Sequence, residues 1–385
     1  MTHRRFRFPT FVVNSLMVLP LGCAVALIWA NVLPEGYFRF AHALDFPVNE
    51  IGIVFFFALM TKQVVEATLA GGPLHPWRRA ALPVAAAIGG IIVSALLYHA
   101  FLDEVEEPML MQAWAVTCAV DVAACYFVGG IIFGRHPAMP FLLLLTIASN
   151  AIGLVILATV HAAPRGNIIG GAVVLASAIL MSYAMRRGRA KSFWPFLLVG
   201  GGLSWIGLWM LGVHPALALV PIVPFMPHGN RDPGLFTEAT SSHDALSSLE
   251  RFWTPPVQLV LFLFGLVNAG VPLHGIEPGF WALPVAVLIG RPVGVMVGAG
   301  LARLAGLHLT LSVGWRELLV IGCAASMGLT LALFFSTAIF PLGTLQLQLK
   351  SGALVTAAGA LVAFLAAWIL RVGRFNKGIP EHATD

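Results

Sequence analysis

The chain has 385 residues, of which 59% are hydrophobic and only 10% are charged. Soluble domains carry about 25% charged residues, so this composition excludes an ordinary soluble domain. The apolar residues form continuous runs instead of alternating at every second position, which indicates an all-α integral membrane protein and excludes a membrane β-barrel.

Twelve apolar runs come close to the roughly 17 to 25 residues that a helix needs to cross a bilayer. We expect them to start near Phe11, Ile51, Ala81, Gln112, Met139, Ile168, Phe193, Pro215, Pro256, Phe280, Glu317 and Gly352. The eighth, over residues 215–227, is short and broken by prolines. We expect a single membrane transporter domain over residues 1–385. Residues 228–254 would connect the eighth and ninth spans in the cytoplasm and would include a short amphipathic helix over 240–252.

The basic residues predict the orientation, because cytoplasmic loops are enriched in Lys and Arg. With the N-terminus inside, 17 of the 22 Lys and Arg residues fall in cytoplasmic loops or tails and three fall outside. We therefore expect a multi-pass membrane protein with both termini in the cytoplasm. The net charge of +5 then reflects this topology, and no nucleic-acid partner is expected.

Motifs for enzymatic chemistry are missing from the sequence. The four cysteines lie inside predicted spans without a C-x-x-C pair, and the chain has no phosphate loop and no G-x-S-x-G elbow. We expect no cofactor, no resident metal and no enzyme activity. A secondary transporter, a channel and a membrane scaffold remain.

Two ionisable residues stand alone inside apolar runs: Asp121 in the fourth span and Arg291 in the tenth. A charge at mid-span costs roughly 2.5 to 3.5 kcal/mol, so such residues usually face a partner or a water-filled path. Small and polar residues cluster around Asp121 and again over residues 322–330. Interrupted segments in corresponding halves of a transporter point to its binding site. Close helix packing, and compensation of helix-end charge by both ionisable residues, are the structural alternatives.

Five segments together carry a family resemblance. They are 80–101 (AALPVAAAIGGIIVSALLYHAF), 212–214 (GVH), 267–275 (VNAGVPLHG), 288–294 (LIGRPVG) and 327–331 (MGLTL). From about residue 11 to 371, the chain resembles the bacterial NhaA sodium/proton antiporters. The resemblance implies twelve transmembrane helices arranged as inverted repeats, with fourth and eleventh helices that unwind near mid-membrane and cross.

The resemblance also implies roles for individual residues. Asp121 falls on the family's aspartate at the break of the fourth helix, and Arg291 falls where the family has a membrane-buried lysine. The family's two adjacent aspartates in the fifth helix are Ser149 and Asn150 here. Hydroxyl and amide oxygens can bind a hard cation but cannot exchange a proton, which leaves Asp121 as the proton carrier.

The leading interpretation is antiport of Na⁺ or Li⁺ against protons by alternating access around Asp121. Ser149 and Asn150 would offer oxygen ligands, and Arg291 would compensate helix-end charge. One titrating carboxylate favours electroneutral exchange. On the cytoplasmic side, Glu66, Lys62 and His214 are candidates for regulation, with an ion pair or simple packing as the alternative.

Two other functions stay open at this point. An anion or neutral-solute carrier could use the same fold with Arg291 as the counter-charge, and a transport-inactive protein could act as a membrane scaffold or regulator. The expected partners are the transported cation, the proton and the lipid bilayer. A homodimer is a further option, although residues 32–50 are too few to hold the hairpin that joins family dimers.

Overall fold

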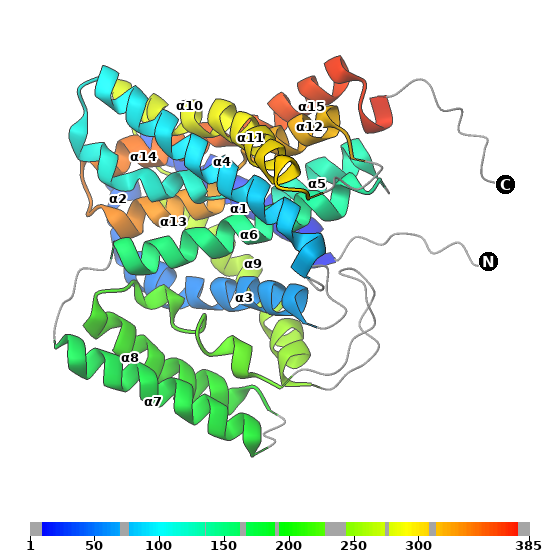
Figure 1. The fold of residues 1–385 in the computed structure, drawn as a ribbon. Coiled ribbons are helices and arrows are strands. Elements are labelled where there is room, and N and C mark those ends of the chain that lie inside the picture. Colours follow the sequence, from blue (N-terminus) through cyan, green and yellow to red (C-terminus); the bar gives the residue numbers. More distant parts are fainter. Residues whose placement is uncertain are drawn as a thin grey trace. The chain divides into compact units, whose positions relative to one another are not determined.

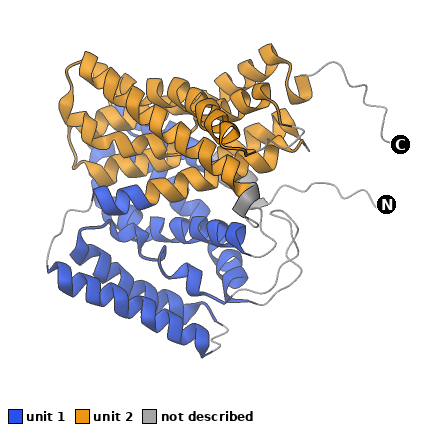
Figure 2. Ribbon diagram, in the orientation of Figure 1, with its two compact units in different colours: residues 1–75, 155–270 blue, residues 76–154, 271–385 orange. Residues whose placement is uncertain are grey.

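The computed structural model describes residues 10–69, 77–134, 136–161, 167–188, 192–227, 244–273, 277–307 and 313–375. These residues are helical or irregular, and the chain divides into two compact units (Figure 2). Unit 1 contains residues 1–75 and 155–270, and unit 2 contains residues 76–154 and 271–385. The all-α prediction is confirmed for the described part of the chain.

The described α-helices of unit 1 range from 10 to 24 residues in length (Figure 1). Its helices are α1 (Thr10–Val32), α2 (Pro34–Phe46), α3 (Ile53–Thr68), α7 (Ile168–Arg187), α8 (Gly202–Leu211) and α9 (Ala245–Asn268). The π-helical turns η1 (Pro47–Gly52) and η3 (Phe196–Gly201) precede α3 and α8. Helix α2 lies in the stretch between the first two predicted spans, where no helix was expected.

The predicted eighth span is not a membrane-spanning helix. Residues 215–227 instead contain two 3₁₀ turns, η4 (Pro215–Leu217) and η5 (Val223–Phe225). Four prolines in this stretch remove backbone donors that an α-helix would need. The segment is nevertheless buried, because Leu219, Ile222 and Met226 join the hydrophobic core of unit 1.

Helix α9 also differs from the prediction. It runs without interruption from Ala245 to Asn268 and contains both Pro255 and Pro256. The expected amphipathic helix and the ninth span are therefore one helix over the described residues, and residues 240–243 lie outside them. Asp244 begins the helix, since its side chain accepts a hydrogen bond from the Ser247 amide at 2.8 Å.

Unit 2 contains the other described α-helices. They are α4 (Trp77–Glu104), α5 (Val122–Phe133), α6 (Ala138–Val160, whose last residues belong to unit 1), α10 (Ala282–Val285), α11 (Arg291–Leu304), α12 (Trp315–Ala324), α13 (Leu329–Ile339), α14 (Thr344–Val355) and α15 (Gly359–Leu370). The 3₁₀ helix η2 (Pro108–Cys118) precedes α5. Lys350, one of the three basic residues expected outside the membrane on the side opposite the cytoplasm, is a buried residue of α14.

Helices α4 and α11 pack against each other through glycines. A Cβ atom built on Gly294 would lie 2.7 Å from the Cα of Gly90, and one built on Gly298 would lie 3.0 Å from the Cα of Gly89. Such distances leave no room for a side chain, so the two backbones are in direct contact. Small residues allow this close approach in membrane helices, where the lipid provides no hydrophobic drive for association.

Six helices of the described residues are long and apolar enough to cross a membrane, and two bent pairs raise this number to eight. One pair is η2 with α5, bent by 57°, and the other is α12 with α13, bent by 51°. The breaks expected near Asp121 and within residues 322–330 are therefore present. The total of twelve spans stays a prediction.

Candidate functional site

Asp121 lies at the break between η2 and α5, where its half-buried side chain caps the following helix. Oδ1 accepts a hydrogen bond from the Ala124 amide at 3.3 Å, as expected of an aspartate at a helix N-terminus. Oδ2 accepts a hydrogen bond from the Thr330 hydroxyl at 2.6 Å. Thr330 belongs to the first turn of α13, so the carboxylate is bound by the beginnings of two helices.

The backbones of the two breaks are in direct contact. The Asp121 amide donates to the carbonyl of Met327, with the nitrogen and oxygen 2.7 Å apart. A Cβ atom on Gly328 would lie 2.6 Å from the carbonyl oxygen of Ala119, which explains the need for glycine at that position. The two broken pairs therefore meet at their irregular segments.

Asn150, on α6, is hydrogen-bonded to the backbone of the first break. Its Nδ2 donates to the carbonyl of Val120 at 2.7 Å, and its Oδ1 accepts from the Val120 amide at 3.0 Å. Val120 lies in the extended segment between η2 and α5, so both of its backbone groups lack a helical partner. The buried Asn150 amide satisfies both groups, as buried backbone groups require.

Ser149, the neighbour of Asn150, is only 1% exposed. Within the described residues its Oγ has no hydrogen-bond partner. An unsatisfied hydroxyl in such surroundings costs free energy unless a ligand or water binds it. The Ser149 oxygen is thus available to bind a ligand, whereas the Asn150 oxygen already accepts one hydrogen bond.

Arg291 is the first residue of α11 and is 1% exposed. Its Nη2 donates to the carbonyl of Thr117, in the last turn of η2, while no partner is described for its Nε. None of the ion pairs among the described residues involves Arg291 or Asp121. The guanidinium therefore stabilises the carbonyl end of η2, and Asp121 stabilises the amide ends of α5 and α13.

These contacts bring the sequence-predicted residues together at one place. Asp121, Asn150 and Arg291 each bind the short stretch from Thr117 to α5, and Ser149 is adjacent to Asn150. The arrangement combines one carboxylate, several oxygens and a fixed positive charge in a buried break. Thr330 also belongs to it, and sequence reasoning placed Thr330 only in a cluster of small residues.

A second polar cluster lies within unit 1. Lys62 on α3 is 3% exposed, and its Nζ lies 2.8 Å from Glu66 Oε1 and 2.5 Å from Glu250 Oε2. The pair of Lys62 with Glu66 follows from their i,i+4 spacing. Glu250 on α9 was not predicted, because nothing in the sequence places it next to α3.

His214 is bound from both sides of its ring. Nε2 lies 3.6 Å from Glu50 Oε1, and Nδ1 accepts from the Ala216 amide at 3.3 Å. The residue therefore begins η4 and contacts η1. The described ion pairs join Lys62 with Glu66 and Glu250, and His214 with Glu50.

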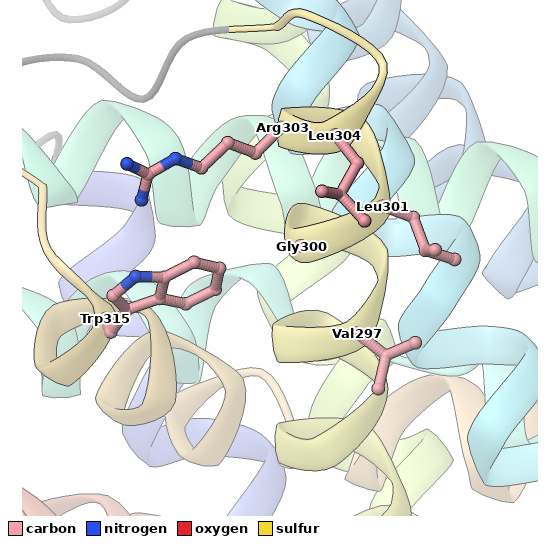
Figure 3. Close-up of a pocket in the computed structure, with 6 residues that line it drawn as sticks. All are labelled: Val297, Gly300, Leu301, Arg303, Leu304 and Trp315. Carbon is pink, nitrogen blue, oxygen red and sulfur yellow. The ribbon is translucent and has the colours of Figure 1, made fainter.

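A hollow of about 710 Å³ lies elsewhere in unit 2, between the end of α11 and the start of α12 (Figure 3). Its lining is mostly apolar, with the Arg303 guanidinium over the ring of Trp315 at 5.9 Å. Figure 3 shows no carboxylate among the lining side chains. The hollow therefore lacks the group that cation exchange needs.

Paired broken helices with ionisable residues buried at the breaks are typical of secondary transporters. A model of the family described as Na⁺/H⁺ antiporter 1 matches residues 12–370, and the chain belongs to that family.

Two relatives illustrate the similarity. The chain is 38% identical over 372 residues to the Na⁺/H⁺ antiporter NhaA of Desulfitobacterium hafniense, covering 94% of this chain and 96% of that protein. It is 40% identical over 367 residues to Na⁺/H⁺ antiporter NhaA 1 of Pelobacter propionicus, covering 92% and 96%. A solved structure of the sodium proton antiporter MjNhaP1 from Methanocaldococcus jannaschii aligns with 94% of this chain and 95% of that chain, at 16% identity and a TM-score of 0.49.

Proposed function

We propose that the protein exchanges Na⁺ or Li⁺ for protons across a bacterial plasma membrane, with both termini in the cytoplasm. The observation that carries this proposal is the environment of Asp121. The carboxylate of Asp121 lies at a helix break and is partly exposed. It forms no ion pair among the described residues. Such a group can bind a cation when ionised and a proton otherwise.

The neighbouring residues support cation binding without a second proton carrier. Ser149 has a buried oxygen without a described partner, and the Asn150 oxygen keeps a second lone pair. Oxygen ligands of this kind suit hard cations. With Asp121 as the single carboxylate, we infer one proton for each monovalent cation, which is an electroneutral exchange.

The geometry argues against Arg291 as the binding group for an anionic solute. Its Nη2 already donates to the Thr117 carbonyl, which is the negative end of η2. A guanidinium with this role stabilises the break and adds a fixed charge near the site. It is a charge-compensating residue in the proposed mechanism.

The test uses the purified full chain in liposomes that contain a pH-sensitive dye. Na⁺ or Li⁺ gradients should move protons in the opposite direction, and K⁺ and small anions should have little effect. Electroneutral exchange predicts that the rate does not depend on an imposed membrane potential. Proton movement driven by an anion gradient instead would assign the protein to anion carriers, and no movement under any gradient would favour a scaffold.

The regulatory role of the unit 1 clusters is part of the same proposal. Lys62, Glu66 and Glu250 connect α3 to α9, and His214 contacts Glu50. A change in the charge of any of these groups would alter contacts between helices of unit 1. We propose that they influence how the transport rate depends on pH, a role separate from cation binding at Asp121.

A further inference from the structure

Thr330 is the second residue of α13, immediately after the second helix break. Its side chain is 6% exposed, and its hydroxyl donates to Asp121 Oδ2 with the two oxygens 2.6 Å apart. The hydrogen bond joins the two broken pairs through their side chains. It is a charge-assisted contact when Asp121 is ionised, and such contacts are roughly twice as strong as neutral ones.

Seven Ser and Thr hydroxyls of unit 2 behave differently. They donate to carbonyls three or four residues earlier in their own segment, which is the common arrangement for Ser and Thr in helices. This group comprises Thr117, Thr146, Ser326, Ser336, Thr337, Ser351 and Thr356. The Thr330 hydroxyl instead donates to the carboxylate of Asp121 on another segment. A hydrogen bond to a carbonyl of its own helix therefore does not explain how this side chain is oriented.

We propose that Thr330 supplies a second oxygen ligand to the cation that binds at Asp121, an inference that rests on the proposed function. A hydroxyl has one donor hydrogen and two acceptor lone pairs. Thr330 can therefore keep donating to Asp121 while one lone pair faces a cation next to Oδ2. When Asp121 carries a proton, the acid group donates to the same hydroxyl oxygen. Both forms of the carboxyl group thus have a partner in Thr330.

The position of Thr330 adds a structural consequence. A cation held by Asp121 and Thr330 touches the first turn of α13 and the residue that caps α5. Cation binding would strengthen the connection between the two breaks, and cation release would weaken it. The ligand pair therefore links occupancy of the site to the arrangement of both broken helices within unit 2.

Three variants of the full chain test this inference in liposomes, with Na⁺ and Li⁺ as the cations. Thr330→Val keeps the size and the β-branch but removes the oxygen, and it should raise the apparent KM for both cations about tenfold, with a smaller effect on the maximal rate. Thr330→Ser keeps the oxygen and should stay within about twofold of the parent protein. Thr337→Val is the matched control on the same helix, because the Thr337 hydroxyl bonds only to its own helix at Phe334, and its KM should not change.

A binding measurement separates this inference from the proposed function. A cation that binds the folded protein raises its melting temperature in detergent, and the rise needs no transport. The rise on addition of Na⁺ or Li⁺ should be present in the parent protein and Thr330→Ser and lost in Thr330→Val. An unchanged KM and an unchanged rise in Thr330→Val would overturn the inference. Absence of exchange in the parent protein would reject the proposed function, while the melting assay would still decide whether Thr330 binds the cation.

Discussion

Asn150 binds both backbone groups of Val120, donating to the carbonyl at 2.7 Å and accepting from the amide at 3.0 Å. An amide side chain can do this because it carries a donor and an acceptor side by side. A carboxylate in the same place could accept from the Val120 amide but would face its carbonyl without a hydrogen to donate. The resemblance implies an aspartate at this position, which would be charged, whereas Asn150 is neutral and acts as a clamp that holds both backbone groups of the helix break.

The first prediction concerns this clamp. Asn150→Ala should lower the free energy of unfolding by about 1 to 3 kcal/mol, because two buried backbone groups lose their partners. Thermal unfolding in detergent measures the effect, and Asn150→Asp should also destabilise the protein. Ser149→Ala is the control, since the Ser149 hydroxyl has no described partner: its melting temperature should not fall, while its apparent cation KM should rise several-fold. Equal melting temperatures for Asn150→Ala and the parent protein would contradict the clamp.

The second prediction concerns the proton carrier. Asp121→Asn removes the only carboxylate of the proposed site but keeps one oxygen that can accept from the Ala124 amide, while its Nδ2 can donate to the Thr330 hydroxyl oxygen. The variant should fold and should show no cation-driven proton movement in dye-loaded liposomes. Exchange at the parental rate would show that the proton is carried elsewhere in the chain.

The third prediction separates charge from geometry at Arg291. Arg291→Lys should keep stability and transport, because a positive charge near the Thr117 carbonyl is what the helix end requires. Arg291→Ala should lower the melting temperature, since the carbonyl end of η2 would lose its cation in a region of low dielectric constant. A lysine variant that is stable but inactive would instead indicate that the planar guanidinium binds a solute.

The fourth prediction concerns the ion cluster of unit 1. Lys62→Met keeps most of the aliphatic stem but leaves Glu66 and Glu250 without their shared partner, and it should lower the free energy of unfolding by about 1 to 3 kcal/mol. Glu66→Gln should cost less, because Lys62 keeps its contact with Glu250. Unfolding in denaturant compares the two variants. A larger loss for Glu66→Gln than for Lys62→Met would show that Lys62 is not the centre of the cluster.

Apolar runs predicted the helical class, and the small and polar residues around Asp121 and over residues 322–330 indicated the position of both breaks. Asp121 lies at the first break, and the Arg291 side chain contacts the same break from α11. The sequence also placed Ser149 and Asn150 beside them, but it did not distinguish their roles. That distinction depends on which hydroxyl or amide reaches the Val120 backbone, and only the folded arrangement supplies it.

Contacts between distant segments could not be predicted in the same way. Glu250 and Lys62 are separated by 188 positions, and Thr330 and Asp121 by 209. Each residue has an ordinary local role in its own helix, so no periodicity marks its partner. The 3₁₀ turns within residues 215–227 were missed for another reason. An apolar sequence shows that a segment avoids water, but it does not show whether the segment is surrounded by protein or by lipid.

The glycine contact between α4 and α11 has a consequence for how the site works. Gly294 and Gly298 leave no space between the two backbones, so α11 cannot rotate or slide against α4 without a steric collision. Arg291 begins the same helix one turn before Gly294. Its positive charge therefore stays in the same place whether or not an ion is bound. Arg291 adds a constant electrostatic potential at the site and does not open or close it. Reorganisation on cation binding would then fall on the irregular segments around Asp121 and Gly328, which lack a regular hydrogen-bond ladder.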